Sequence, residues 1–240
     1  MDESDTGVPA SIEEAWGRRR RPRRGPKPAL GLERIVDAAV KVAAADGLAA
    51  VSMSRVAAEL GSSPMGLYRY VAAKDELLAL MVDAALGAPP ATRPPSEGWR
   101  AGLARWAWAY HDVLRRQPWA LQVPSGPAVT PNLTAWLEDG LRSLGETGLA
   151  EAEKLSVMLL LSGYVRNEAT LVADLGTTEE IMPAWGRQLA ALTGPERFPA
   201  LHAALASGVF DQDDEPDDEF VFGLERVLDG IEALVTARAA

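Results

Sequence analysis

Apolar residues recur every three to four positions along most of the chain, which is the period of an α-helix. The first stripe runs from Ile35 to Ala43 and stops before Gly47, a residue type favoured just after a helix end. Further helices are expected at residues 74–86, 99–116, 132–144, 151–174, 178–192, 199–205 and 220–237. No segment alternates apolar and polar residues in the manner of a β-strand. The pattern therefore predicts an all-α protein.

Two short helices joined by a glycine turn are expected directly after the first stripe. Ser52 or Ser54 can cap the first of them, which ends at Leu60. Gly61 interrupts the pattern, and Pro64 opens the second helix because proline is tolerated in the first helical turn. A helix pair of this kind can place its second helix in the major groove of DNA while the first crosses the backbone.

Acidic and basic residues are distributed unevenly along the chain. The formal net charge of −10 divides into −5, +7 and −12 over residues 1–15, 16–75 and 76–240. The basic block begins with an arginine- and proline-rich run at 18–28, which contains Arg23 and Arg24 and cannot fold alone. One basic face on an acidic body favours binding to a polyanion such as DNA.

The turn-rich segment 87–96 divides the chain into two folded domains. Residues 1–29 are expected to form a disordered arm that is acidic at first and then arginine-rich. Residues 30–86 are expected to form a three-helix helix-turn-helix domain with a fourth, connecting helix. Residues 97–240 form a larger, acidic helical domain.

The composition argues against several classes of protein. With no cysteine and two histidines, the chain offers no disulfide, no thiolate metal site and no catalytic cluster, so neither an enzyme nor a bound cofactor is expected. Residues 1–12 are too acidic for a signal peptide, and the longest apolar run, near 155–165, is about half of a membrane span. We expect a soluble, cytoplasmic protein. The acidic run 211–219 lacks the glycine of a calcium-binding loop, which favours a solvated loop.

Several residues of the two short helices and of the helix that follows recur at a spacing typical of a known family. They are Ala57-x-x-Leu60-Gly61, Leu67-Tyr68-x-x-Val71 and Lys74-x-x-Leu77-Leu78. Over residues 30–85 the chain therefore resembles the TetR family of bacterial repressors. The second domain resembles the TetR-type C-terminal region more loosely, at Gly126-Pro127, Pro131-Asn132, Trp136-Leu137 and 159–165. The resemblance implies that this domain binds a ligand and forms the dimer.

The resemblance also implies DNA contacts residue by residue. The side chains that face the major groove are Met65, Gly66, Tyr68 and Tyr70. Those that reach phosphates are Ser52, Ser54, Arg55, Tyr68 and Lys74. Apart from the resemblance, we expect further sequence specificity to come from Arg69, from water or from DNA shape. We also expect some of the arginines at 18–24, among them Arg23 and Arg24, to enter a flanking minor groove or follow phosphates. Either Tyr68 or Tyr70 can instead be a packing residue.

The second domain carries many aromatic residues for an alanine- and leucine-rich bundle. The candidates for a ligand pocket are Trp106, Tyr110, His111, Trp119, Trp136, Tyr164, Asn167 and Trp185. The aromatic residues among them also suit core and dimer packing, and His111 is more readily a hydrogen-bonded core histidine than a ligand contact. The polar run 166–168 can bind the polar end of a ligand, pair across a dimer or face solvent.

The family's mechanism supplies an expectation for the whole chain. Two copies pair through residues 151–174 and 220–237 and place two recognition helices about 34–36 Å apart on a palindromic operator in double-stranded DNA. A small apolar ligand in the second domain moves the helix at 74–86 and releases the DNA. The alternatives are an activator, a regulator without a ligand, and a helical small-molecule-binding protein or enzyme with no DNA role.

Overall fold

The computed structural model describes residues 7–18, 30–90, 96–124, 128–175, 181–212 and 217–239. These residues form helices, turns and loops and no strand, so the all-α prediction is confirmed. In chain order the α-helices are α1 (Ala10–Ala15), α2 (Leu32–Asp46), α3 (Met53–Glu59), α4 (Pro64–Tyr68), α5 (Lys74–Leu86), α6 (Trp99–Arg116), α7 (Pro131–Ser143), α8 (Glu151–Leu175), α9 (Ile181–Leu192), α10 (Pro199–Ala206) and α11 (Asp218–Ala239). The short 3-10 helices are η1 (Leu48–Ala50), η2 (Pro118–Gln122) and η3 (Val209–Asp211).

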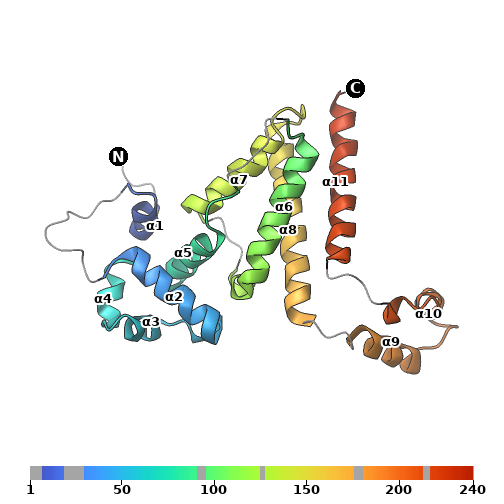
Figure 1. Ribbon diagram of the computed structural model, residues 1–240, viewed down its shortest axis with the longest axis horizontal. Coiled ribbons are helices and arrows are strands. Elements are labelled where there is room, and N and C mark those ends of the chain that lie inside the picture. The colour runs from blue at the N-terminus through green and yellow to red at the C-terminus, as the bar shows by residue number, and fades with distance from the viewer. Residues whose placement is uncertain are drawn as a thin grey trace.

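Helices α2 to α5 form the N-terminal domain (Figure 1). Ile35 and Ala39 lie one turn apart on α2, and both are fully buried. Val56 of α3, Leu67 of α4 and Leu77 of α5 are also fully buried and belong to the same apolar cluster. One buried stripe on α2 therefore organises the three helices that follow it.

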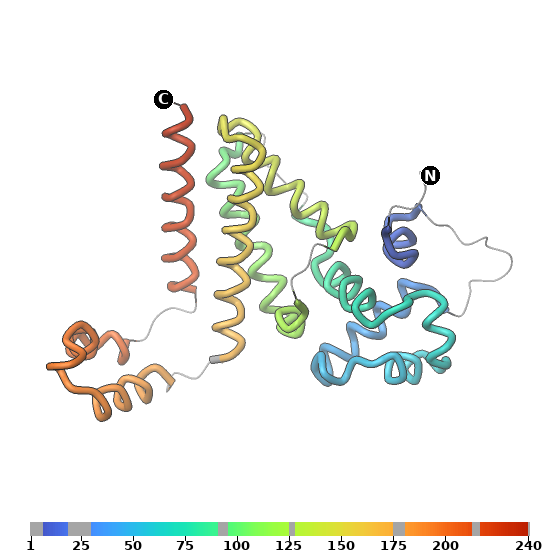
Figure 2. The backbone as a smooth tube through the Cα atoms, turned by 180° about the vertical axis from the view of Figure 1, so that it is seen from behind, coloured from blue at the N-terminus to red at the C-terminus, as the bar shows by residue number. Residues whose placement is uncertain are grey.

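Helices α6, α7, α8 and α11 form the second domain. In Figures 1 and 2, α6 and α8 lie side by side, α11 runs alongside them, and α7 leans toward α5. Leu103 of α6, Leu161 of α8 and Leu224 of α11 share one apolar cluster. Helices α9 and α10 project from the end of the bundle, where Trp185 packs edge-on against Phe210.

The two domains meet along α5 and η2. Trp119 and Ala120 of η2 are buried in the apolar cluster of the N-terminal domain. Trp136 of α7 donates its indole N–H to the carbonyl of Gly87, just after α5, at 2.9 Å. Side chains of the second domain therefore pack against the N-terminal domain and form hydrogen bonds with it.

Helix α1 contradicts the expectation that residues 1–17 are disordered. Ile12 is buried against the N-terminal domain, and Ser11 Oγ donates to Glu76 Oε2 at 2.7 Å. Trp16 donates its indole N–H to the carbonyl of Val129, in the second domain, at 2.8 Å. The expectation is wrong for Ala10–Ala15 because a helix too short to be stable alone is held here by tertiary contacts.

Three other expectations concern membrane spans, metal sites and the acidic run 211–219. Among the described helices, none is long and apolar enough to cross a bilayer. The same part of the chain holds no group of three or more side chains able to bind a metal ion. Of the acidic run, Asp218 and Glu219 open α11, where carboxylates interact favourably with the helix N-terminus. Residues 213–216 lie outside the described residues.

Candidate functional site

Helices α3 and α4 form a helix-turn-helix whose two N-termini are capped by serines. Ser52 Oγ accepts the backbone N–H of Arg55 at 3.1 Å, and Ser63 Oγ accepts that of Gly66 at 3.2 Å. Gly61 lies between the helices with φ of 60°, a left-handed conformation that glycine adopts without strain. The caps and the glycine fix the geometry in which α4 leaves the turn.

The outer face of α4 presents apolar and aromatic groups to solvent. Met65 is 74% exposed and Tyr68, one turn further along, is 47% exposed. Arg69 and Lys74 follow in the sequence and are exposed, as is Ser54 on α3. A thioether and a phenol left in water on a capped helix, next to cationic side chains, are suited to a major groove and its phosphates.

Tyr70 has a different position from Tyr68. Its hydroxyl donates to the carbonyl of Leu30 at 2.9 Å, and its ring is half-buried against the domain core. Tyr70 is thus the packing tyrosine of the pair, and it holds the chain at Leu30, two residues before α2 begins. Arg23 and Arg24, the expected minor-groove residues, lie outside the described part of the chain.

Two further residues expected at the DNA have partners within the domain. A Cβ on Gly66 would lie 2.9 Å from Ser62 Oγ, and the backbone N–H of Gly66 donates to Ser63 Oγ. Arg55 forms an ion pair with Asp46 at 3.1 Å, and both side chains are about half exposed. An exposed pair of this kind is weak, so Arg55 can exchange its carboxylate for a phosphate at little cost.

The ligand candidates from the sequence separate into distinct groups. Trp106, Tyr110 and Trp136 form one aromatic group, with ring centroids 5.2–5.9 Å apart. The indole N–H of Trp106 donates to the carbonyl of Trp136 at 2.8 Å. Trp119 lies at the junction of the domains and Trp185 on the projecting α9. The structure therefore brings only part of the predicted set together.

His111 and Tyr164 belong to a second aromatic group, around Phe220 of α11. The His111 ring stacks on Phe220 with centroids 4.1 Å apart, and Tyr164 lies nearly parallel to Phe220 at 5.8 Å. Tyr164 donates its hydroxyl to the carbonyl of Phe220 at 2.8 Å. Burial, together with the negative charge of Glu168, raises the pKa of Tyr164 to about 12.

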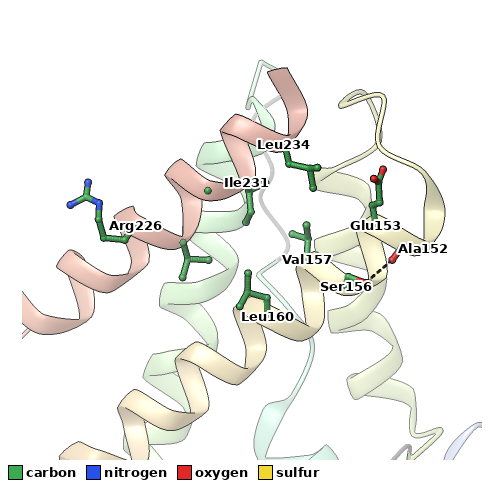
Figure 3. Close-up of a pocket in the computed structure, with 10 residues that line it drawn as sticks. Ala152, Glu153, Ser156, Val157, Leu160, Arg226, Ile231 and Leu234 are labelled. Atoms are coloured by element: carbon green, nitrogen blue, oxygen red, sulfur yellow. Dashed lines mark hydrogen bonds between the residues drawn. The ribbon is translucent and has the colours of Figure 1, made fainter. Parts of the chain in front are cut away.

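Helices α8 and α11 both carry exposed apolar side chains. They are Leu155, Leu159, Leu160, Leu171 and Val172 on α8 and Val221 and Phe222 on α11. Between the two helices runs a groove of about 500 Å³, into which Val157 and Leu160 point from α8 and Ile231 and Leu234 from α11 (Figure 3). Asn167 is also exposed on α8. Exposed apolar side chains along two neighbouring helices, beside an apolar groove, are typical of a protein interface.

Asp83 is a functional candidate that the sequence analysis missed. It is buried on α5, and its Oδ1 accepts the backbone N–H groups of Asn132 and Leu133 at 2.8 and 3.0 Å. Asn132 Nδ2 donates to the carbonyl of Asp83 at 2.9 Å. The available signal was a carboxylate on the apolar face of a helix, since such groups are buried only with partners. Asp83 joins the connecting helix to the start of α7.

Comparisons with known proteins agree with this architecture. Residues 35–81 match the family described as bacterial regulatory proteins, tetR family, and residues 70–235 match the tetracyclin repressor-like C-terminal domain. The HTH-type transcriptional repressor DrrR1 of Streptomyces coeruleorubidus is 39% identical over 249 residues, covering 96% of this chain and 88% of that protein. These relatives are regulators and not enzymes.

Two solved structures of ActR from Streptomyces coelicolor are similar in fold. Apo ActR has a TM-score of 0.75 and 26% identity, covering 90% of this chain and 100% of that one. ActR in complex with actinorhodin has a TM-score of 0.76 and 26% identity, covering 88% and 99%. Since both domains match along nearly the whole chain, the protein belongs to the TetR family of bacterial DNA-binding transcriptional regulators.

Proposed function

We propose that the protein is a homodimeric repressor that binds a palindromic operator and is released by a small, largely apolar ligand in the bacterial cytoplasm. The observation that carries the proposal is the outer face of α4, where Met65 and Tyr68 are exposed on a helix fixed by two capping serines. Exposed apolar groups on a rigid recognition helix are suited to thymine methyl groups and base edges. Ser54 and Lys74 flank this face and supply phosphate contacts.

A dimer formed through α8 and α11 is the reason for proposing a palindromic operator. Leu159 of α8 is 75% exposed, and Phe222 of α11 is 62% exposed. Burying the same surface of two copies about a two-fold axis forms a four-helix interface and removes this area from water. A two-fold dimer presents its two α4 helices to two half-sites related by the same symmetry.

The release step follows from how the domains are joined. ActR is crystallised with actinorhodin, and the second domain of this chain has the same fold. A ligand that displaces α7 relative to α6 transmits the displacement to α5, because Asn132 of α7 is bonded to Asp83 of α5 and Trp136 of α7 to Gly87 directly after α5. Such a ligand weakens DNA binding only by its differential affinity for the two arrangements, on the order of 5 kcal/mol for a near-complete switch.

Selection of bound sequences from a random pool of duplex DNA tests this function. The purified full-length protein is used at near-physiological salt, with Tyr68→Ala as the variant and Tyr70→Phe as the matched control. We expect the wild type and Tyr70→Phe to enrich one palindrome and Tyr68→Ala to enrich none while still forming dimers. Enrichment of a non-palindromic site would contradict the dimeric arrangement, and equal enrichment by Tyr68→Ala would contradict the assignment of the recognition face.

A further inference from the structure

The helix-turn-helix domain itself is not basic. Residues 30–86 contain five cationic and seven anionic side chains, a formal charge of −2, and the excess of positive charge near the N-terminus comes from residues 18–27. Attraction to the phosphates of DNA is electrostatic, so a carboxylate beside a DNA-contacting cation weakens binding. The position of each carboxylate in this domain therefore bears on DNA affinity.

Asp46 lies beside a cation on the helix that precedes the recognition helix. Its Oδ2 is 3.1 Å from Nη2 of Arg55, and the two side chains are 46% and 49% exposed. Arg55 follows the exposed Ser54 in the first turn of α3. In a helix-turn-helix this helix crosses the DNA backbone. The guanidinium that Asp46 holds is therefore a candidate for a phosphate contact.

The stability of the fold does not explain an aspartate at position 46. Asp46 is the last residue of α2, and the last turn of this helix has no basic residue. A carboxylate is unfavourable there because the C-terminus of a helix carries partial negative charge. The helix is closed by Gly47, whose N–H donates to the carbonyl of Ala43, without the side chain of Asp46. A residue that departs from such a local preference is expected where function requires it.

A phosphate and Asp46 compete for the same guanidinium. Arginine presents its N–H donors in a planar fork, which carboxylates and phosphates accept in the same geometry. Arg55 reaches a phosphate either by leaving Asp46 or by bringing the phosphate next to the carboxylate. In the first case an ion pair is lost, and in the second two anions are brought together. Both lower the gain from the phosphate contact.

We propose that Asp46 is an intramolecular competitor of DNA, which holds Arg55 in the free protein and lowers its affinity for any duplex. The proposal rests on the proposed DNA-binding function. Phosphate contacts carry no sequence information, whereas the side chains of Met65 and Tyr68 on α4 are suited to base edges. By weakening a phosphate contact, Asp46 reduces the amount of protein held on non-specific DNA, which is present in large excess in a genome.

Fluorescence anisotropy titrations of the full-length protein with two duplexes test the competition. One duplex is the palindrome selected from the random pool, and the other has a random sequence of the same length. Asp46→Asn keeps the size of the side chain and removes its charge. We expect about two- to fivefold tighter binding to both duplexes for each bound protomer, which is the worth of an exposed ion pair converted to affinity. The slope of log affinity against log salt should become steeper by about one per protomer, because Asp46 no longer takes up a cation when Arg55 leaves it.

Three further variants show whether the effect passes through Arg55. Arg55→Gln should weaken binding, and Asp46→Asn should then add less than about 1.5-fold in the double variant. Asp37→Asn removes an equal charge from the exposed face of α2, about 13 Å along the helix from Asp46, and should change binding less than about 1.5-fold at physiological salt. The thermal midpoint of Asp46→Asn should stay within about 2 °C of the wild type, so that tighter binding is not a consequence of stability.

Each other result contradicts the competition. Unchanged binding by Asp46→Asn would overturn it, and so would weaker binding, since Asp46 then orients Arg55 for the phosphate. A gain that persists without Arg55, or an equal gain in Asp37→Asn, would overturn it in favour of general charge repulsion. Enrichment of a palindrome with no effect of Asp46→Asn leaves the repressor function and removes the competition. The expected variant pattern on the random duplex, without an enriched palindrome, supports the competition and contradicts the sequence-specific repressor.

Discussion

Asp83 caps a helix to which it does not belong. The first turn of α7 has no cap of its own, because the side chain of Thr130 makes no cap hydrogen bond and Pro131 has no N–H. Asp83 Oδ1 accepts the next two N–H groups, of Asn132 and Leu133, from across the domain boundary. Replacing Asp83 with alanine therefore removes the N-cap of α7 and the link between the two domains in one step.

The cost of Asp83→Ala can be assembled from the contacts. Loss of an N-cap costs about 1 kcal/mol, and loss of a carboxylate from a helix N-terminus about 0.3–1 kcal/mol. The hydrogen bond from Asn132 Nδ2 to Asp83 Oδ2, at 3.2 Å, adds about 1 kcal/mol. We expect unfolding free energy to fall by about 2–3 kcal/mol. Asp83→Asn keeps one acceptor oxygen for the backbone and should lose about 1 kcal/mol.

Urea unfolding at one fixed protein concentration measures these changes, since dimer stability depends on concentration. Asn132→Ala and the double variant complete a cycle in which the two substitutions should couple by about 1 kcal/mol. Operator affinity of Asp83→Ala should also fall, because α5 is then less firmly oriented. A loss below about 0.5 kcal/mol in Asp83→Ala, or strict additivity with Asn132→Ala, would refute the capping role.

Four other substitutions test separate parts of the structure. Tyr68→Ala should lower operator affinity at least tenfold in a fluorescence anisotropy titration, with Tyr70→Phe close to wild type; the reverse order would contradict the assignment of the two tyrosines. Leu159→Glu should convert the dimer to monomers in sedimentation velocity, since it places two charges in an apolar interface; an unchanged dimer would exclude the α8 surface. Trp16→Ala should cost about 1 kcal/mol and speed amide exchange in α1 while leaving α4 protected, whereas unchanged exchange would mean that the indole bond does not hold α1. Wild-type stability should fall between pH 10 and pH 12, because the folded protein holds the Tyr164 proton up to a pKa of about 12; Tyr164→Phe should lack this decline, and an identical decline in both would contradict it.

The helices and the helix-turn-helix could be predicted because their signals are local. Each buried stripe, such as Ile35 and Ala39 on α2, repeats at helical spacing within a few residues. The capping serine at position 52 and the turn glycine at position 61 act on neighbouring backbone groups. These residues act on backbone groups within a few positions of themselves in the sequence, so the sequence pattern alone predicts their structural role.

Helix α1 shows where a local pattern fails. Six residues with two glutamates and no sustained apolar stripe give no reason to expect a helix. Its stability comes from Glu76 and Val129, which lie 65 and 113 positions away in the sequence. Contacts between positions so far apart cannot be recognised in a short stretch of sequence. The acidic composition of residues 1–17 then suggests disorder instead.

The role of a buried polar residue also depends on partners that are distant in the sequence. Asp83, Tyr70 and His111 each place a polar atom among apolar neighbours, and the sequence alone does not say which partner that atom meets. Tyr70 meets a carbonyl 40 positions away, and Asp83 meets backbone N–H groups 49 and 50 positions away, so both are structural. His111 meets an aromatic ring and a carboxylate but no hydrogen-bond partner. A polar group completed by protein partners has no further capacity for a ligand, so the tertiary partners of a polar residue, rather than the number of aromatic residues nearby, decide whether it is available for binding.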